Sequence, residues 1–167
     1  DTTLHSGSGS VPSLTIGTVN DVFAMAKHEV PVKHSVTFLN ALASVGDTDL
    51  ECHPQASSNT IGHITRSGSG TPSNPHIYAA KPGRADSPVN FVGWDDAARF
   101  INWLVTGSTE SGSYDMSQTF PTREPDAPIF LPTQNEWQKA AYYDPRTAAD
   151  GGPPNDDHYW LYPQQSN

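Results

Sequence analysis

The chain has little cysteine, little positive charge and no long apolar stretch. Its one cysteine, Cys52, excludes a disulfide framework within the chain. Nine Lys and Arg against 18 Asp and Glu give a net charge of -9, and without a basic stripe we expect no nucleic acid as a partner. No run of about 18 apolar residues occurs, so the sequence predicts no membrane insertion.

The proportion of charged residues is also low. They make up 16% of the chain, below the roughly 25% usual in soluble domains, and Pro, Gly, Ser, Thr and Asn take their place. Such a surface is typical of a secreted or extracellular protein, including a periplasmic or cell-surface one. The first residue is Asp1 rather than Met, which favours a mature chain that has lost a targeting segment.

The 167 residues suffice for one domain with a core, and the apolar pattern predicts three helices in it. The first covers residues 32–45, the second has Asp95 as its N-cap and ends at Gly107, and the third follows Thr133 and ends before Pro145. These helices are the regular elements of a chain that Gly, Pro and Ser otherwise interrupt.

Short strands and long loops are expected between the helices. Alternating apolar residues predict a strand that ends at Pro31, and a second short strand covers residues 89–92. Residues 46–88 show no sustained period, which predicts a long loop with one short strand near residues 61–65 or 77–79.

Residues 129–145, IFLPTQNEWQKAAYYDP, carry the most specific local signal. Thr133 is followed three residues later by Glu136, which is the spacing of a capping box, where each side chain bonds the backbone N–H of the other residue. Trp137 begins the apolar face of the helix that follows. We therefore expect the box to fix where this indole enters a core.

Three segments occur in a characteristic order: EVPVKHSVTFLNALA (29–43), PVNFVGWDDAARFINWL (88–104) and IFLPTQNEWQKAAYY (129–143). Together they resemble the formylglycine-generating enzyme or sulfatase-modifying-factor family, and YWLYPQQSN (159–167) resembles its secreted bacterial branch. Pro31 departs from the family pattern, which has Thr there. The residues that match the family's structural motif are Trp94, Asp95, Trp103, Leu131, Pro132, Thr133, Glu136 and Trp137.

The resemblance implies an α+β fold of the irregular C-type-lectin-like kind, with short helices, a small antiparallel sheet and long loops. It also implies that residues 20–167 form the N-terminal portion of one domain, preceded by an extended N-terminal arm at residues 1–19. The remaining half of the domain, or a companion protein chain, is then expected as a partner.

The family members that oxidise a sulfatase cysteine to formylglycine use a copper-binding pair of cysteines in the C-terminal half of the domain. No residue of this chain matches that pair, so the resemblance identifies no catalytic residue and no cofactor here. Copper is expected only if the remaining half carries the pair. Two hypotheses stay open: a secreted binding or assembly module, or the non-catalytic half of a copper-dependent oxidase that acts on a protein cysteine.

Two groups of side chains are candidate metal ligands, although neither has the spacing of a known motif. Thiolate and imidazole suit copper or zinc, and the candidates are Cys52, His53, His63 and His76. Oxygen ligands suit calcium, and the candidates are Asn155, Asp156 and Asp157. The alternatives are loop histidines without a metal and a solvated turn. The tryptophans of the motif are interpreted as packing residues rather than as a sugar-stacking surface.

Overall fold

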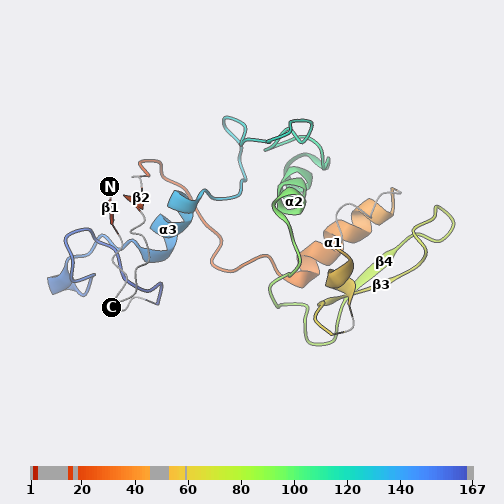
Figure 1. The fold of residues 1–167 in the computed structure, drawn as a ribbon, viewed down its shortest axis with the longest axis horizontal. Coiled ribbons are helices and arrows are strands. Elements are labelled where there is room, and N and C mark those ends of the chain that lie inside the picture. Colours follow the sequence, from red (N-terminus) through yellow and green to blue (C-terminus); the bar gives the residue numbers. More distant parts are fainter. Residues whose placement is uncertain (1, 4–14, 17–18, 46–52, 59, 165–167) are drawn as a thin grey trace. The chain divides into compact units, whose positions relative to one another are not determined.

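The computed structural model describes residues 2–3, 15–16, 19–45, 53–58 and 60–164. The chain divides into two compact units, and each is described by itself. Unit 1 comprises Asp1–Met25 and Pro132–Asn167, and unit 2 comprises Ala26–Leu131. Among the described residues, the elements of unit 2 are α1 (Val32–Ala43), the 3-10 helix η1 (Pro54–Ser57), β3 (Ile64–Ser67), β4 (Ile77–Ala80) and α2 (Trp94–Thr106) (Figure 1).

The core of unit 2 forms around α1. The predicted apolar face is buried, with Val32, Leu39 and Ala43 almost inaccessible to solvent. Phe38 lies in the same cluster and contacts two aromatic rings of α2 edge-on or tilted, Phe100 and Trp103, each with its centroid 5.4 Å away. The predicted first helix is therefore confirmed, although α1 ends at Ala43.

The strands β3 and β4 form an antiparallel hairpin. Ile64 pairs with Ala80 and Ser67 pairs with Ile77, so both of the alternative strand positions within the predicted loop are strands. Ile64 and Tyr78 are buried against the α1 cluster, whereas Ile77 points to solvent. A short apolar stretch thus becomes a strand here because a helix covers one face of the hairpin.

The first turn of α2 corrects the predicted cap. Gly93, not Asp95, is the N-cap residue, and its N–H donates to the Asp96 carboxylate at 2.8 Å. Asp96, the third residue of the helix, bonds the N–H of the N-cap residue with its carboxylate. Glycine can therefore be the N-cap although it has no side chain of its own. At the other end, Gly107 has φ 79 and its N–H bonds Trp103 O at 2.9 Å, which confirms the predicted end of the helix.

Two other predicted strands are wrong. Residues 20–30 have no regular structure and residues 89–92 form no strand. What remains is a single antiparallel bridge between Pro31 and Pro88. Proline has no backbone N–H, so a bridge between two prolines cannot extend into a ladder from these positions.

In α1 and in α2, one asparagine side chain forms hydrogen bonds with the backbone of a tyrosine later in the chain. Asn40 Nδ2 donates to Tyr78 O at 2.9 Å, and Tyr78 N donates to Asn40 Oδ1 at 2.9 Å. Asn102 does the same with Tyr114, at 2.8 and 2.9 Å. We call these pairs the asparagine clasps. Each amide bonds both the N–H and the C=O of its tyrosine, as the edge of a second neighbouring strand would.

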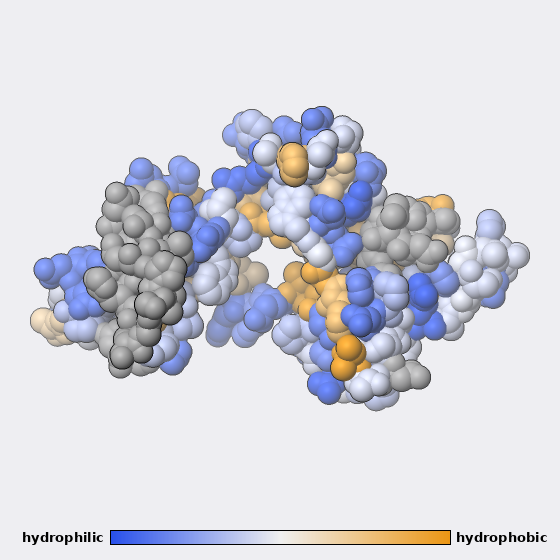
Figure 2. All heavy atoms as spheres, in the orientation of Figure 1, coloured by the Kyte–Doolittle hydropathy of each residue, from blue (hydrophilic) through white to orange (hydrophobic). Residues whose placement is uncertain are grey.

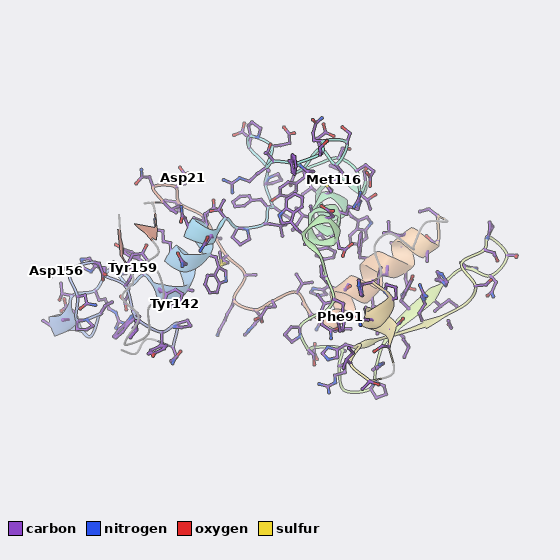
Figure 3. The ribbon with its side chains drawn as sticks, viewed as in Figure 1. Asp21, Phe91, Met116, Tyr142, Asp156 and Tyr159 are labelled. Carbon is purple, nitrogen blue, oxygen red and sulfur yellow. The ribbon has the colours of Figure 1, made fainter. Side chains whose placement is uncertain are left out.

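The clasp on α2 organises the long loop that follows it. Asn102 is fully buried and also donates to Thr109 O at 3.0 Å. Tyr114 packs on α2 and its hydroxyl accepts the N–H of Leu131 at 2.9 Å. Met116 packs against the same small cluster and lies beside α2 (Figure 3). The loop therefore has a defined path despite its lack of regular structure.

Unit 1 contains β1 (Thr2–Thr3), β2 (Thr15–Ile16), α3 (Gln134–Tyr142) and the 3-10 helix η2 (Ala148–Asp150). The two short strands pair antiparallel, and most of the predicted arm at residues 1–19 lies outside the described residues. An isolated antiparallel bridge joins Tyr143 to Tyr159. The predicted third helix is thus confirmed, and it ends at Tyr142, before Asp144 and Pro145.

The fold class is α+β, as predicted, with three short α-helices, a small antiparallel hairpin sheet and long loops within the described part of the chain. The C-type-lectin-like likeness and the assignment of residues 20–167 to part of one domain stay predictions. Within the same residues, no helix has the length and apolar character needed to cross a bilayer.

The Asn102→Ala variant tests the clasp on α2. It leaves Tyr114 N and O and Thr109 O without their partner in a buried site, and we expect it to lower the free energy of unfolding by about 2–3 kcal/mol. Urea denaturation followed by tryptophan fluorescence measures the change. Exposed Asn20→Ala is the control, and equal stability of the two variants would contradict the assigned role.

Candidate functional site

The capping box predicted at the start of α3 is present. Thr133 N donates to Glu136 Oε2 at 2.7 Å, and Glu136 N donates to Thr133 Oγ1 at 3.2 Å. Glu136 is 6% exposed, so its carboxylate is committed to the helix end. The capping bonds therefore account for the burial of this carboxylate.

The motif tryptophans differ in their surroundings. Trp103 is partly buried and packs against Phe38 and Phe100, as expected for a core residue. Trp94 is 47% exposed and Trp137 is 48% exposed. The described residues therefore do not enclose these two indoles, although Trp94 contacts Tyr114 edge-on at 5.4 Å.

A buried carboxylate binds the segment after α3 to the chain near residue 160. Asp144 accepts bonds from Arg146 N at 3.1 Å, Arg146 Nη2 at 2.6 Å and Trp160 Nε1 at 3.3 Å. The side-chain and backbone bonds of Arg146 hold the pKa of Asp144 well below its usual value, and the Trp160 bond acts in the same direction. We call this group the Asp144 network, and nothing in the sequence beyond the Asp-Pro stop indicates it.

The candidate calcium ligands lie in the turn just before His158, whose backbone O accepts the N–H of Asp144 at 2.9 Å; Figure 3 labels Asp156 of this turn. Asp157 Oδ1 accepts the N–H of Tyr159 at 3.0 Å, and Asn155 O accepts the N–H of His158 at 3.3 Å. Burial raises the pKa of the Tyr159 hydroxyl, helped by Tyr143 and Asp157. These hydrogen bonds are enough to form the turn without a metal ion. A calcium site here stays a prediction.

The candidate histidines each lie in a different local setting. His53 caps η1 by accepting the N–H of Gln55 at 3.2 Å and stacks on Phe91 at 5.8 Å. The Nδ1 atoms of His63 and His76 lie 3.3 and 3.2 Å from backbone carbonyl oxygens. Cys52 lies outside the described residues. Over the described ranges, no three His, Cys, Asp or Glu side chains gather as a metal site.

A copper site of the two-cysteine kind does not fit this chain. Such a site needs two thiolates, and the chain has one cysteine. A single thiolate therefore supports no chemical step through copper in this chain.

The described residues of unit 2 form at least two concave surfaces. A pocket of about 220 Å³ lies between the end of α1 and the tip of the β3–β4 hairpin, lined by Ala43, Ser44, Val45, Gly70, Thr71, Pro72, Pro75 and His76. The apolar groove, as we call the second, has a volume of about 80 Å³ and lies between the start of α1 and α2. Its lining residues are Val30, Ser35, Phe38, Val89, Val92, Asp96, Ala97 and Phe100.

The segment between Val89 and Val92, two residues that line the groove, includes an unusual backbone conformation. Phe91 has φ 59, a value that is uncommon for a bulky residue. Beside it, Asn90 Nδ2 donates to Ile61 O at 2.9 Å, while the buried Asn90 Oδ1 has no hydrogen-bond partner in the described part of the chain. Sequence reasoning missed the groove because it interpreted residues 89–92 as a strand.

The three motif segments therefore contribute α1, α2 with its preceding turn, and the capped start of α3. A family model for the sulfatase-modifying factor enzyme 1-like domain matches residues 8–161. The chain belongs to this family. Comparisons with the curated proteins and with the solved structures gave no match. Membership in the sulfatase-modifying factor family confirms the resemblance drawn from the three segments.

The Thr133→Ala variant tests the capping box of this family member. Loss of the hydroxyl removes the acceptor for Glu136 N, and we expect the free energy of unfolding to fall by about 1 kcal/mol. Urea denaturation compares it with exposed Thr119→Ala, for which we expect no change. An equal effect of both substitutions would show that the box contributes nothing.

The Asp144 network predicts an acid-sensitive stability. Because folding depresses the pKa of Asp144, the network stabilises the fold fully above the ordinary carboxyl pKa, and the stabilisation declines as the pH falls through the folded value. Asp144→Asn is expected to be less stable at neutral pH and to lose less stability on acidification between about pH 5 and pH 2. Urea midpoints measure this, with exposed Asp156→Asn as the control. An unchanged pH slope in Asp144→Asn would refute the assignment.

Proposed function

We propose that the chain serves as a binding or assembly module of a secreted or extracellular protein, and that it contributes no catalytic residue itself. The observation that carries this proposal is the exposure of large apolar side chains on a scaffold in which carboxylates cap the starts of α2 and α3. Contiguous exposed apolar surface typically marks a protein–protein contact. The remaining half of the domain, or a companion chain, is the expected partner.

The exposed apolar side chains occur in both units. Figure 2 shows hydrophobic side chains gathered at the start of α1, where the apolar groove opens. Large apolar residues that remain at least about two-fifths exposed include Val92, Trp94, Leu104, Ile129, Trp137, Tyr143 and Tyr162. Trp and Tyr are the residues most enriched at the energetic centres of protein interfaces.

The scaffold suits a presenting role because two of its described segments between the helices are held in place by side-chain hydrogen bonds. The asparagine clasps bind the β3–β4 hairpin and the loop after α2 to the two helices. Binding residues lie disproportionately on loops that a rigid scaffold positions. We infer that the segments at 46–88 and 107–128 supply the variable part of the binding surface.

Family membership favours a second candidate, the non-catalytic half of a copper-dependent oxidase that converts a protein cysteine to formylglycine. In that case the cysteine pair belongs to polypeptide outside this sequence. The two candidates differ in whether the complete natural protein carries two cysteines a few residues apart. Intact-mass analysis and sequencing of the natural protein distinguish them.

The purified chain alone is expected to leave a sulfatase-derived cysteine peptide unmodified in the presence of copper and oxygen, because one cysteine cannot form the pair. Mass spectrometry of the peptide is the measurement, with a complete formylglycine-generating enzyme as the positive control. Conversion of the peptide by this chain would overturn the non-catalytic role.

The binding role predicts that partners cover the exposed indoles. Acrylamide should quench Trp94 and Trp137 in the isolated chain, but much less in the assembly purified from its natural source. Trp94→Phe and Trp137→Phe variants assign the signal, and Trp103→Phe serves as the partly buried comparison. Equal quenching of both indoles in the two preparations would contradict a role in assembly.

A further inference from the structure

The segment at residues 20–30 contains no helix or strand (Figure 1). Every residue from 24 to 30 is exposed to solvent. Within the described part of the chain, no hydrogen bond or ion pair involves residues 20–29, and the first backbone bond after them runs from Val89 N to Val30 O at 2.9 Å. Local opening of this segment therefore breaks few interactions.

The segment carries one basic side chain, Lys27. The chain has nine Lys and Arg, all of them among the described residues. Four of the others belong to a helix or a strand: Lys33, Arg66, Arg99 and Lys139. The remaining four are fixed in loops by hydrogen bonds, a backbone bridge or a cation–π contact: Lys81, Arg84, Arg123 and Arg146. Lys27 is therefore the basic residue whose neighbouring backbone is easiest to draw into the cleft of another protein.

A serine protease of the trypsin class needs these features in a folded substrate. Its acidic S1 pocket selects a basic side chain on the N-terminal side of the cleaved bond. The substrate residues on both sides of that bond bind as an extended strand, through main-chain hydrogen bonds. Residues 24–29 can supply such a strand, because their backbone groups bond no other residue in the described part of the chain. Small side chains at Ala24 and Ala26 also suit a site of nicking.

We propose that the Lys27–His28 peptide bond is the site at which a trypsin-like serine protease cleaves the folded chain. The reaction is a hydrolysis in which the bond between Lys27 C and His28 N breaks. The oxygen of a water molecule joins the Lys27 carbonyl carbon to form a carboxylate, and His28 N becomes an amine.

The position of this bond gives the cut a structural consequence. The chain passes from unit 1 to unit 2 between Met25 and Ala26, and it returns between Leu131 and Pro132. Cleavage after Lys27 removes one of these two covalent connections and leaves the other intact. The proposal goes beyond the binding role proposed above, and its test does not depend on that role.

Brief digestion of the whole purified chain with a small amount of trypsin tests the proposal. Intact-mass analysis of early samples should show residues 1–27 and 28–167 as the first pair of fragments. Lys27→Gln removes the charge that the S1 pocket binds. It should slow the loss of the intact chain by about tenfold or more, because cleavage elsewhere requires an element or a bonded turn to open.

Two further variants serve as controls, and Lys27 has no described partner whose loss could disturb the fold. Lys27→Arg keeps the positive charge and should be cut at the same place as the unmodified chain. Lys33→Gln removes an exposed lysine that lies in α1, and it should be cut at the unmodified rate.

Three results would overturn the proposal: a first cut at another basic residue, resistance of the unmodified chain to trypsin, or equal digestion rates of Lys27→Gln and Lys33→Gln. Simultaneous appearance of many fragments would also overturn it, since cleavage would then follow global unfolding. The acrylamide quenching of Trp94 and Trp137 tests the binding role independently of each of these results.

Discussion

The requirement that buried backbone polar groups find partners shapes unit 2 more than any other constraint. Its loops are long, and strands supply partners to few of their N–H and C=O groups. The side chains of Asn40 and Asn102 meet this need by bonding both backbone groups of Tyr78 and Tyr114. An unsatisfied amide in a buried part of a helix is costly, and the fully buried Asn102 is satisfied by the loop that it holds. The partly buried Asn40 is satisfied in the same way by β4.

The sequence correctly predicted most of the features that depend only on contacts between residues close together in the chain. The three helices, the Gly107 end and the Thr133–Glu136 box require contacts within a few positions, and all of them form. The N-cap of α2 was misplaced because Asp95 and Asp96 both suit a helix start, and only the backbone decides which residue caps it. The strands predicted up to Pro31 and at residues 89–92 failed because Pro31 and Pro88 cannot extend their bridge, whereas strands form at both positions predicted as alternatives, near residues 61–65 and 77–79.

Contacts between distant residues were harder to predict. The clasps join residues 38 and 12 positions apart, and an asparagine inside a helix gives no local sign of its partner. A weak signal exists in hindsight, since Phe-Leu-Asn-Ala-Leu in α1 and Phe-Ile-Asn-Trp-Leu in α2 share a pattern. The apolar groove was missed for a related reason: its wall combines α1, α2 and an irregular segment. Family membership, in contrast, was carried by three short motifs and is confirmed.

The central claim is that the side-chain amides of Asn40 and Asn102 hold β4 and the loop after α2 to the two helices of unit 2 in this member of the sulfatase-modifying factor family. Hydrogen exchange of individual backbone amides tests it most directly, through the N–H groups of Tyr78 and Tyr114 that donate to Asn40 and Asn102. The account predicts that both amides exchange as slowly as those in the middle of α1 and α2. Exchange as fast as that of the exposed loop amides near Phe120 would contradict it.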